Sequence, residues 1–187
     1  KLLTIAVAVV EASASLSYDI PNVAKNVDFI NLMSYDLHGS WEGVTGINAP
    51  LYAGSVDISS YQKQLNIDAI VNYWVAQGAP RDKLILGIPL YGRSFTLSNS
   101  NNYGVGAATS GAGNAGSFVP ESGFLAYGEI CLNIKNGVFS RYWENTQKVP
   151  YAVGGNQWVG YDDSESIAYK INYIKDNSLG GAMFWSI

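Results

Sequence analysis

The chain has 187 residues, of which 48% are hydrophobic and only 14% are charged, and its formal net charge is −4. This length and composition allow one sizeable core, or a core with a small annex. A weakly acidic chain without a run of Lys or Arg excludes an electrostatic footprint for nucleic acid, and no apolar run reaches the roughly 20 residues that span a membrane.

The first apolar run occupies residues 2–9 and is followed by Ala12-Ser13-Ala14. An apolar run before an A-x-A triplet mimics a secretory signal peptide with its cleavage site. The same run is also β-prone and about one strand long. We favour a buried strand, because no initiator Met and no charged segment stand before Lys1.

Three further apolar runs, at 28–35, 84–91 and 181–187, are similar to the first. They are nearly continuous rather than alternating, which is typical of parallel strands that are covered on both faces. The sequence therefore predicts a set of buried parallel strands.

Helical patterns lie between these runs. Apolar residues recur at helical spacing over 67–75, with Asn66 as the expected N-cap. A later helix carries isoleucines over 167–174, and Asp162 with Glu165 has the spacing of a capping box at its start. Alternating strands and helices predict an α/β fold with a parallel sheet.

Residues 96–153 interrupt this alternation. Their first part, 97–117, is rich in Gly, Ser and Asn, and later segments such as Arg141-Tyr142-Trp143 and 157–161 are typical of antiparallel strands. A connection of this length is expected to have structure of its own, so we predict an inserted α+β subdomain. Four parallel strands make half of an eightfold barrel and leave exposed sheet edges, so we expect the sequence to be incomplete at both ends.

Cys131 is the one cysteine and His38 the one histidine. A lone thiol forms no internal disulfide, and no Cys/His cluster is present to bind a metal. We expect neither a cofactor nor a metal.

Polar and aromatic residues gather at the ends of the expected strands. Met33-Ser34-Tyr35-Asp36 closes the second run, Tyr91-Gly92-Arg93 closes the third, and Met183-Phe184-Trp185 lies on the fourth. In a barrel these ends line the active face, which favours a cleft. The alternative is that the polar strand ends cap the sheet while the aromatic residues pack beneath loops.

Four ordered segments carry a family resemblance. FINLMSYD at 29–36, LILGIPLYGRSF at 84–95, QWVGYDDSES at 157–166 and GGAMFW at 180–185 resemble animal-type chitinases of glycoside hydrolase family 18. The resemblance implies a partial TIM (β/α)8 barrel, strands five to eight, with an inserted α+β subdomain between strands seven and eight. It divides the chain into 1–95, the inserted 96–153, and 154–187, which returns to the barrel.

One family signature does not occur. The D-x-x-D-x-D-x-E run, whose Glu protonates the glycosidic oxygen, is absent, so the resemblance places that Glu upstream of Lys1. We therefore expect the chain on its own to be inactive and to fold poorly. Cys131 resembles an insertion cysteine that pairs with a downstream cysteine, and the family implies a secreted, extracellular protein.

The resemblance also assigns roles. This family uses the acetamido group of the sugar as the nucleophile, and Tyr35 and Asp36 match the residues that assist it. Asp36 has an alternative reading as the structural partner of Arg93, and Met33 as a core residue. The implied substrate-binding residues are Met33, Trp41, Tyr91, Arg93, Met183 and Trp185.

Two functions remain open for the parent protein. The first is a retaining chitinase that cleaves β-1,4-N-acetylglucosamine linkages in chitin. The second is a chitinase-like lectin that binds chito-oligosaccharides without cutting them. The residue at the end of strand four separates them. In both cases we expect the full-length protein to be a monomer. Its expected partner is chitin or a chito-oligosaccharide, and not a membrane. A non-carbohydrate α/β scaffold protein is a third and weaker interpretation.

Overall fold

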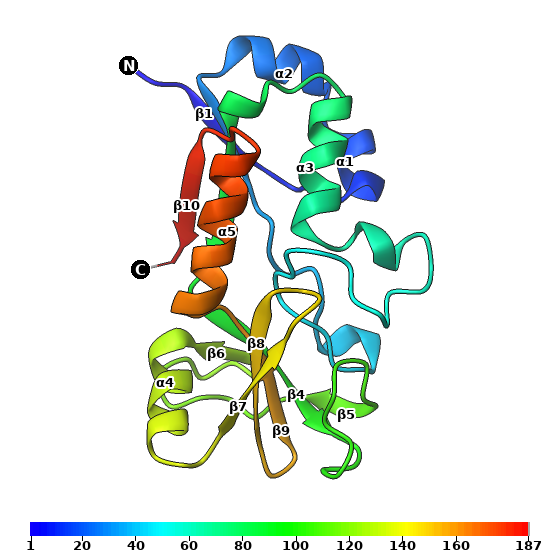
Figure 1. Cartoon of the computed structure of the whole chain (residues 1–187), viewed down its shortest axis with the longest axis vertical. Coiled ribbons are helices and arrows are strands. Elements are labelled where there is room, and N and C mark those ends of the chain that lie inside the picture. The colour runs from blue at the N-terminus through cyan, green and yellow to red at the C-terminus, as the bar shows by residue number, and fades with distance from the viewer. Residues whose placement is uncertain (187) are drawn as a thin grey trace.

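The parallel sheet forms the upper half of the molecule (Figure 1). The computed structural model describes residues 1–186. The sheet contains β1 (Thr4–Val7), β2 (Phe29–Leu32), β3 (Leu84–Pro89) and β10 (Gly181–Trp185), in the order β1-β2-β3-β10 with all pairs parallel. All four apolar runs thus contain the expected strands, although each strand is shorter than its run. Ile187, the last residue of the fourth run, lies outside the described residues.

Two short helices, α1 (Glu11–Ser17) and α2 (Ile20–Asn26), connect β1 to β2. Ala12-Ser13-Ala14, which resembles a cleavage site, lies inside α1. The strand reading of the first run is therefore confirmed. Neither helix was predicted, since each spans only 7 residues and so offers too little helical periodicity to detect.

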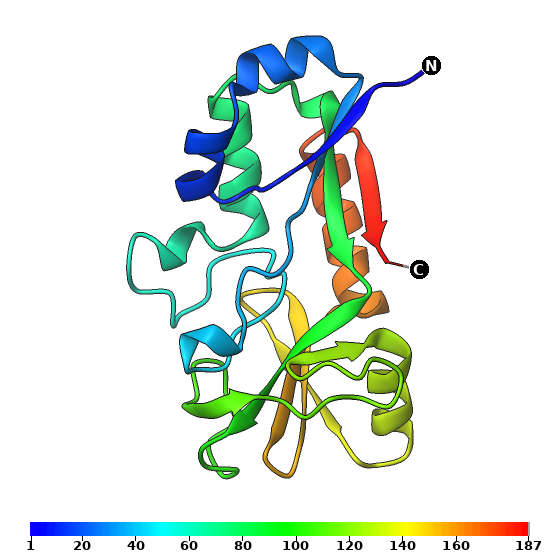
Figure 2. The same cartoon turned by 180° about the vertical axis from the view of Figure 1, so that it is seen from behind.

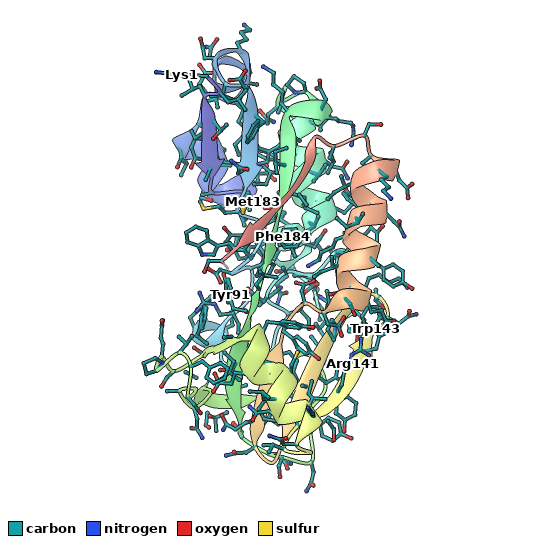
Figure 3. All side chains as sticks on the ribbon, turned by 90° about the vertical axis from the view of Figure 1, so that its left-hand side faces the viewer. Lys1, Tyr91, Arg141, Trp143, Met183 and Phe184 are labelled. Carbon is teal, nitrogen blue, oxygen red and sulfur yellow. The ribbon has the colours of Figure 1, made fainter. Side chains whose placement is uncertain are left out.

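The longer helix α3 (Ile67–Ala76) begins as the sequence predicts. Asn66 is its N-cap, and its side chain accepts a hydrogen bond from the Ala69 N–H at 3.0 Å. Ile67, Ile70, Val71 and Trp74 of this helix are buried against the strands. Seen from the side, α3 and α5 lie on one side of the parallel strands (Figure 3).

Helix α5 (Ser164–Asp176) is confirmed, but its capping box is displaced by one residue. The N-cap is Asp163, whose carboxylate accepts from the N–H of Ser166, while the Ser166 hydroxyl accepts from the Asp163 N–H. The expected Asp162–Glu165 pair is wrong because the Asp162 carboxylate is buried and bound to Lys170 at 2.6 Å. A buried charge needs a partner, so Asp162 does not cap the helix.

The second sheet fills the lower half of the molecule (Figure 1) and is antiparallel. Its main strands follow the order β5-β4-β9-β8-β7, with β6 paired to β4, and one helix, α4, accompanies them. The bounds are β4 (Tyr91–Leu97), β5 (Thr109–Ala112), β6 (Phe124–Ala126), α4 (Tyr127–Lys135), β7 (Ser140–Glu144), β8 (Val149–Gly154) and β9 (Gln157–Gly160).

This sheet extends beyond the predicted insertion at 96–153. The chain changes sheets at Leu90, whose N–H donates to Trp185 of the parallel sheet and whose carbonyl accepts from Tyr127 beside the antiparallel one. Figure 2 shows this passage from β3 into β4 as one continuous course. Gly92 permits the close approach of β4 to β9, because a Cβ there would lie 2.5 Å from Val159 of β9. The second sheet therefore begins at Tyr91 and ends at Gly160.

No helix within residues 1–186 is long and apolar enough to cross a membrane. Cys131 lies on α4, partly buried, and forms no disulfide within the same residues. Its pairing with a downstream cysteine remains a prediction.

Candidate functional site

A cavity of about 500 Å³ opens on the face of the parallel sheet opposite the buried core. Alternate residues of a strand point to the same face. This rule holds for β2 and for the residues that continue it as far as Tyr35. Ile30 and Leu32 are fully buried in the core, whereas Asn31, Met33 and Tyr35 line the cavity. The lining also includes Ala6, Asp36, Met183 and Trp185.

Asp36 is the charged group of the cavity wall. Its Oδ1 accepts a hydrogen bond from the Tyr91 hydroxyl at 2.6 Å and one from Arg93 Nε at 2.8 Å. The Asp36 side chain still keeps 40% of its surface exposed. The structural pair with Arg93 therefore exists alongside the position of Asp36 in the cavity wall, and the two readings are compatible.

Arg93 is surrounded by three aromatic rings. Its guanidinium carbon lies 5.6 Å from the Trp41 ring centre, 5.8 Å from Tyr91 and 5.7 Å from Phe124. Tyr91 and Phe124 stack with their ring centres 4.4 Å apart. Cation–π contacts of this kind hold a guanidinium in place. Trp41 thus joins the site through Arg93, while 62% of its surface remains exposed.

The acid–base state of these groups follows from burial and from Asp36. Burial raises the pKa of Tyr35, and the nearby negative charge of Asp36 raises it further. Burial alone would lower the pKa of Arg93, but the hydrogen bond and charge of Asp36 outweigh it, and the pKa is raised. The phenol and the guanidinium therefore both keep their protons near neutral pH and remain hydrogen-bond donors.

Tyr91 leads to a pH prediction. Burial, followed by the hydrogen bond to Asp36, raises the pKa of Tyr91 well above its ordinary value of 10.0. A folded pKa above the unfolded one gives stability that is complete below the unfolded pKa and is lost at higher pH. We expect the free energy of unfolding to fall from about pH 10 upward, and Tyr91→Phe to reduce that slope by up to about 1.4 kcal/mol per pH unit.

Urea denaturation at several alkaline pH values measures this slope for the wild-type protein and for Tyr91→Phe. Parallel stability profiles for the two proteins above about pH 10 would contradict the assignment, since one fewer phenol would then make no difference to proton release on unfolding.

The structure brings all eight predicted site residues into one connected group. Five of them, Met33, Tyr35, Asp36, Met183 and Trp185, line the cavity, and Tyr91 and Arg93 bind Asp36. Figure 3 shows Met183 on β10 and Tyr91 where the chain enters the lower sheet. Trp41 completes the group through its contact with Arg93.

Three neighbours of this group were not predicted. Asn31 and Ala6 line the cavity, and Phe124 stacks on Tyr91. Asn31 had a sequence signal, because it precedes Met33 and Tyr35 at the two-residue period of one strand face. Phe124 had none, because β6 approaches β4 only through the fold. Within residues 1–186 there is no group of three or more His, Cys, Asp or Glu side chains that could hold a metal ion.

Comparison with known proteins places this geometry in a family. The profile described as "Glycosyl hydrolases family 18" matches residues 1–187. The chain belongs to glycoside hydrolase family 18. The mixed α/β fold is accordingly that of a glycoside hydrolase family 18 protein.

Relatives in the family include both enzymes and enzyme-like proteins. Human Chitinase-3-like protein 2 is 48% identical over 190 residues, covering 100% of this chain and 47% of that protein. Mouse Chitotriosidase-1 is 45% identical over 184 residues, covering 98% of this chain and 38% of that protein. The chain thus spans less than half the length of these relatives.

The similar solved structures also include both an active chitinase and a pseudo-chitinase. An "immunomodulatory active chitinase" from Trichuris suis superposes with a TM-score of 0.96 at 43% identity, over 99% of this chain and 50% of that chain. Human YKL-39, described as "a pseudo-chitinase with retained chitooligosaccharide binding properties", superposes with a TM-score of 0.94 at 46% identity, over 100% of this chain and 50% of that chain.

Proposed function

We propose that this glycoside hydrolase family 18 chain forms one wall of a chito-oligosaccharide cleft in a chitinase that cleaves β-1,4-N-acetylglucosamine linkages with retention. The observation that carries the proposal is the placement of Asp36. Its carboxylate is held by Tyr91 and Arg93 on one oxygen, Oδ1, beside a cavity lined by Tyr35 and Trp185. In this proposal the chain supplies strands five to eight of the barrel and the inserted subdomain.

The proposed chemistry is substrate-assisted. The acetamido carbonyl oxygen of the sugar attacks the anomeric carbon while the bond from that carbon to the protonated leaving oxygen breaks, and water then opens the cyclic oxazolinium that has formed. The Tyr35 hydroxyl, which retains its proton, orients that acetamide by donating a hydrogen bond. Because both protein donors use Oδ1 of Asp36, Oδ2 is available to accept from the acetamide N–H. The acid that protonates the leaving oxygen is the family Glu, which does not occur in residues 1–187.

The remaining cavity residues suit the sugar itself. Trp185 is 56% exposed, as a stacking floor for the apolar face of a pyranose requires. Met183 and Met33 offer polarizable thioethers to the acetamide methyl. Trp41 extends the aromatic surface beyond Arg93.

The second candidate is a lectin that binds chito-oligosaccharides without cutting them. One observation favours it: a pseudo-chitinase is among the similar structures. Tyr35, Asp36 and Trp185 serve both functions, since binding and hydrolysis use the same cavity wall. Secretion and a monomeric state are further predictions for the whole protein.

Cleavage and binding assays of the whole protein separate the candidates, and Tyr35→Phe tests the role of Tyr35. If the protein is a chitinase, we expect kcat/KM on a fluorogenic chitobioside to fall by about 100-fold, because a preorganised donor to the developing charge is lost. If it is a lectin, the wild-type protein releases no fluorophore but binds chito-oligosaccharides in calorimetry. Tyr52→Phe is the matched control, since Tyr52 packs against Tyr173 away from the cavity. A wild-type protein that neither cleaves nor binds would refute both candidates.

A further inference from the structure

The backbone of Asp36 adopts a conformation that residues other than glycine rarely occupy. Its φ is 58°, in the left-handed region. Such a conformation persists at functional sites only where surrounding contacts enforce it. The hydrogen bonds that fix the backbone at Asp36 and Leu37 are both accepted by one residue, Asn48.

Asn48 is fully buried in the long segment that follows β2. Its side-chain Oδ1 accepts a hydrogen bond from the Asp36 N–H at 2.8 Å, and its backbone carbonyl accepts one from the Leu37 N–H at 3.0 Å. Its Nδ2 donates to the backbone carbonyl of Tyr91 at 3.1 Å. One amide group therefore joins the left-handed residue to the first residue of β4.

These bonds close a ring with the candidate site. Asn48 holds the backbones of Asp36 and Tyr91, and the Tyr91 hydroxyl returns to the Asp36 carboxylate at 2.6 Å. Asn48 is not part of the cavity lining. It can therefore act on a bound sugar only through the two residues that it holds.

We propose that Asn48 is the positioning residue that sets the Asp36–Tyr91 pair for the acetamido group of a chito-oligosaccharide. This inference rests on the proposed function. Both ends of the amide are needed, because one accepts from Asp36 while the other donates to Tyr91. Asn48→Asp keeps the shape and the acceptor but presents an oxygen to the Tyr91 carbonyl. Asn48→Leu keeps a similar size and loses both bonds.

Asn66 provides a matched control within the same chain. It is 3% exposed, its Oδ1 accepts from the Ala69 N–H at 3.0 Å, and its Nδ2 donates to the Lys63 carbonyl at 2.9 Å. It therefore makes the same two kinds of bond at the start of α3, outside the cavity lining. Asn66→Asp and Asn66→Leu report the cost of disrupting a buried amide without touching Asp36.

The first measurement is the Kd of the whole protein for the tetramer of N-acetylglucosamine, by calorimetry at a temperature where every variant is folded. We expect both Asn48 variants to bind about tenfold more weakly, because a small displacement of an orienting group costs much of its effect. The Asn66 variants should change by less than about twofold, although their melting temperatures fall as well. Equal losses of affinity in the two pairs would overturn the proposal.

The second measurement is hydrogen exchange at the Asp36 amide. Exchange should accelerate in Asn48→Leu relative to the Asn66 variants, because the acceptor of this amide is removed, and much less in Asn48→Asp, which keeps an acceptor. Unchanged exchange in Asn48→Leu would show that Asn48 does not hold Asp36 and would also overturn the proposal. A wild-type protein that binds no chito-oligosaccharide would refute the proposed function instead, and the exchange result would still decide whether Asn48 holds Asp36.

Discussion

Lys170→Met is expected to lower the free energy of unfolding by about 3–5 kcal/mol, because it leaves a buried carboxylate without its counter-charge. Lys170 is fully buried on α5, and its ammonium donates to Asp162 Oδ1 at 2.6 Å and to the Ala49 carbonyl at 2.7 Å. Burial lowers the pKa of Lys170 even though Asp162 raises it. The pair is therefore costly to bury and more costly to break.

Two companion variants test this reasoning by chemical denaturation. Lys170→Met combined with Asp162→Leu should recover most of the loss, since apolar replacements of a whole buried pair are often neutral. Glu165→Gln should cost no more than about 1 kcal/mol, because its bond to Arg141 joins a side chain that is 50% exposed. A double variant no more stable than Lys170→Met alone would show that the ion pair is not the source of the effect.

The Lys170 pair also bears on the candidate site. Ala49, which accepts from the Lys170 ammonium, directly follows Asn48 in the chain. Helix α5 thus anchors the segment that holds Asp36. We expect Lys170→Met to weaken chito-oligosaccharide binding as well as stability.

Gly87→Ala is expected to cost about 3 kcal/mol, at the upper end of what overpacking a core usually costs. Gly87 lies in β3, and a Cβ there would stand 2.2 Å from the Leu32 carbonyl oxygen and 3.0 Å from the Tyr35 ring. The nearer obstacle is backbone, which no rotamer change can move away. The end of β2 must therefore shift, and Tyr35 and Asp36 lie within four residues of it.

Gly104→Ala is the control, because a Cβ there meets nothing within 4 Å. We expect it to change the free energy of unfolding by less than about 0.5 kcal/mol. The measurements are denaturation and chito-oligosaccharide affinity for both variants. Gly87→Ala with wild-type stability and affinity would mean that β2 and β3 can separate without disturbing the cavity wall.

Local sequence patterns predicted the parts of the fold that depend on neighbouring residues. The apolar runs located β1, β2, β3 and β10, and the amphipathic spacing with Asn66 located α3. These features can be predicted from the sequence, because the strand and helix periods set which face each side chain occupies. The short helices α1 and α2 were missed for the same reason, since two turns carry too little period.

The strand-end motifs also predicted most of the candidate site. Tyr35, Asp36 and Trp185 stand at the ends of parallel strands, which bring such positions to one edge of a sheet. Tyr91 and Arg93 were expected to close the third parallel strand, but they belong to the antiparallel strand β4, which begins after the chain has left β3. The roles of these residues in binding and catalysis are still proposals.

By itself, the sequence determined the parallel strands, the two longer helices and the candidate residues at the strand ends. Only the tertiary structure decided that Asp162 pairs with Lys170 instead of capping α5, that the chain changes sheets at Leu90, and that Asn48 holds Asp36. Each of these depends on groups that meet only in the folded chain: Tyr91 is 43 residues from Asn48, and Ala49 is 121 from Lys170. Such partners are determined by burial and by the need of buried polar groups for hydrogen bonds. The local periodicity of the sequence does not reveal them.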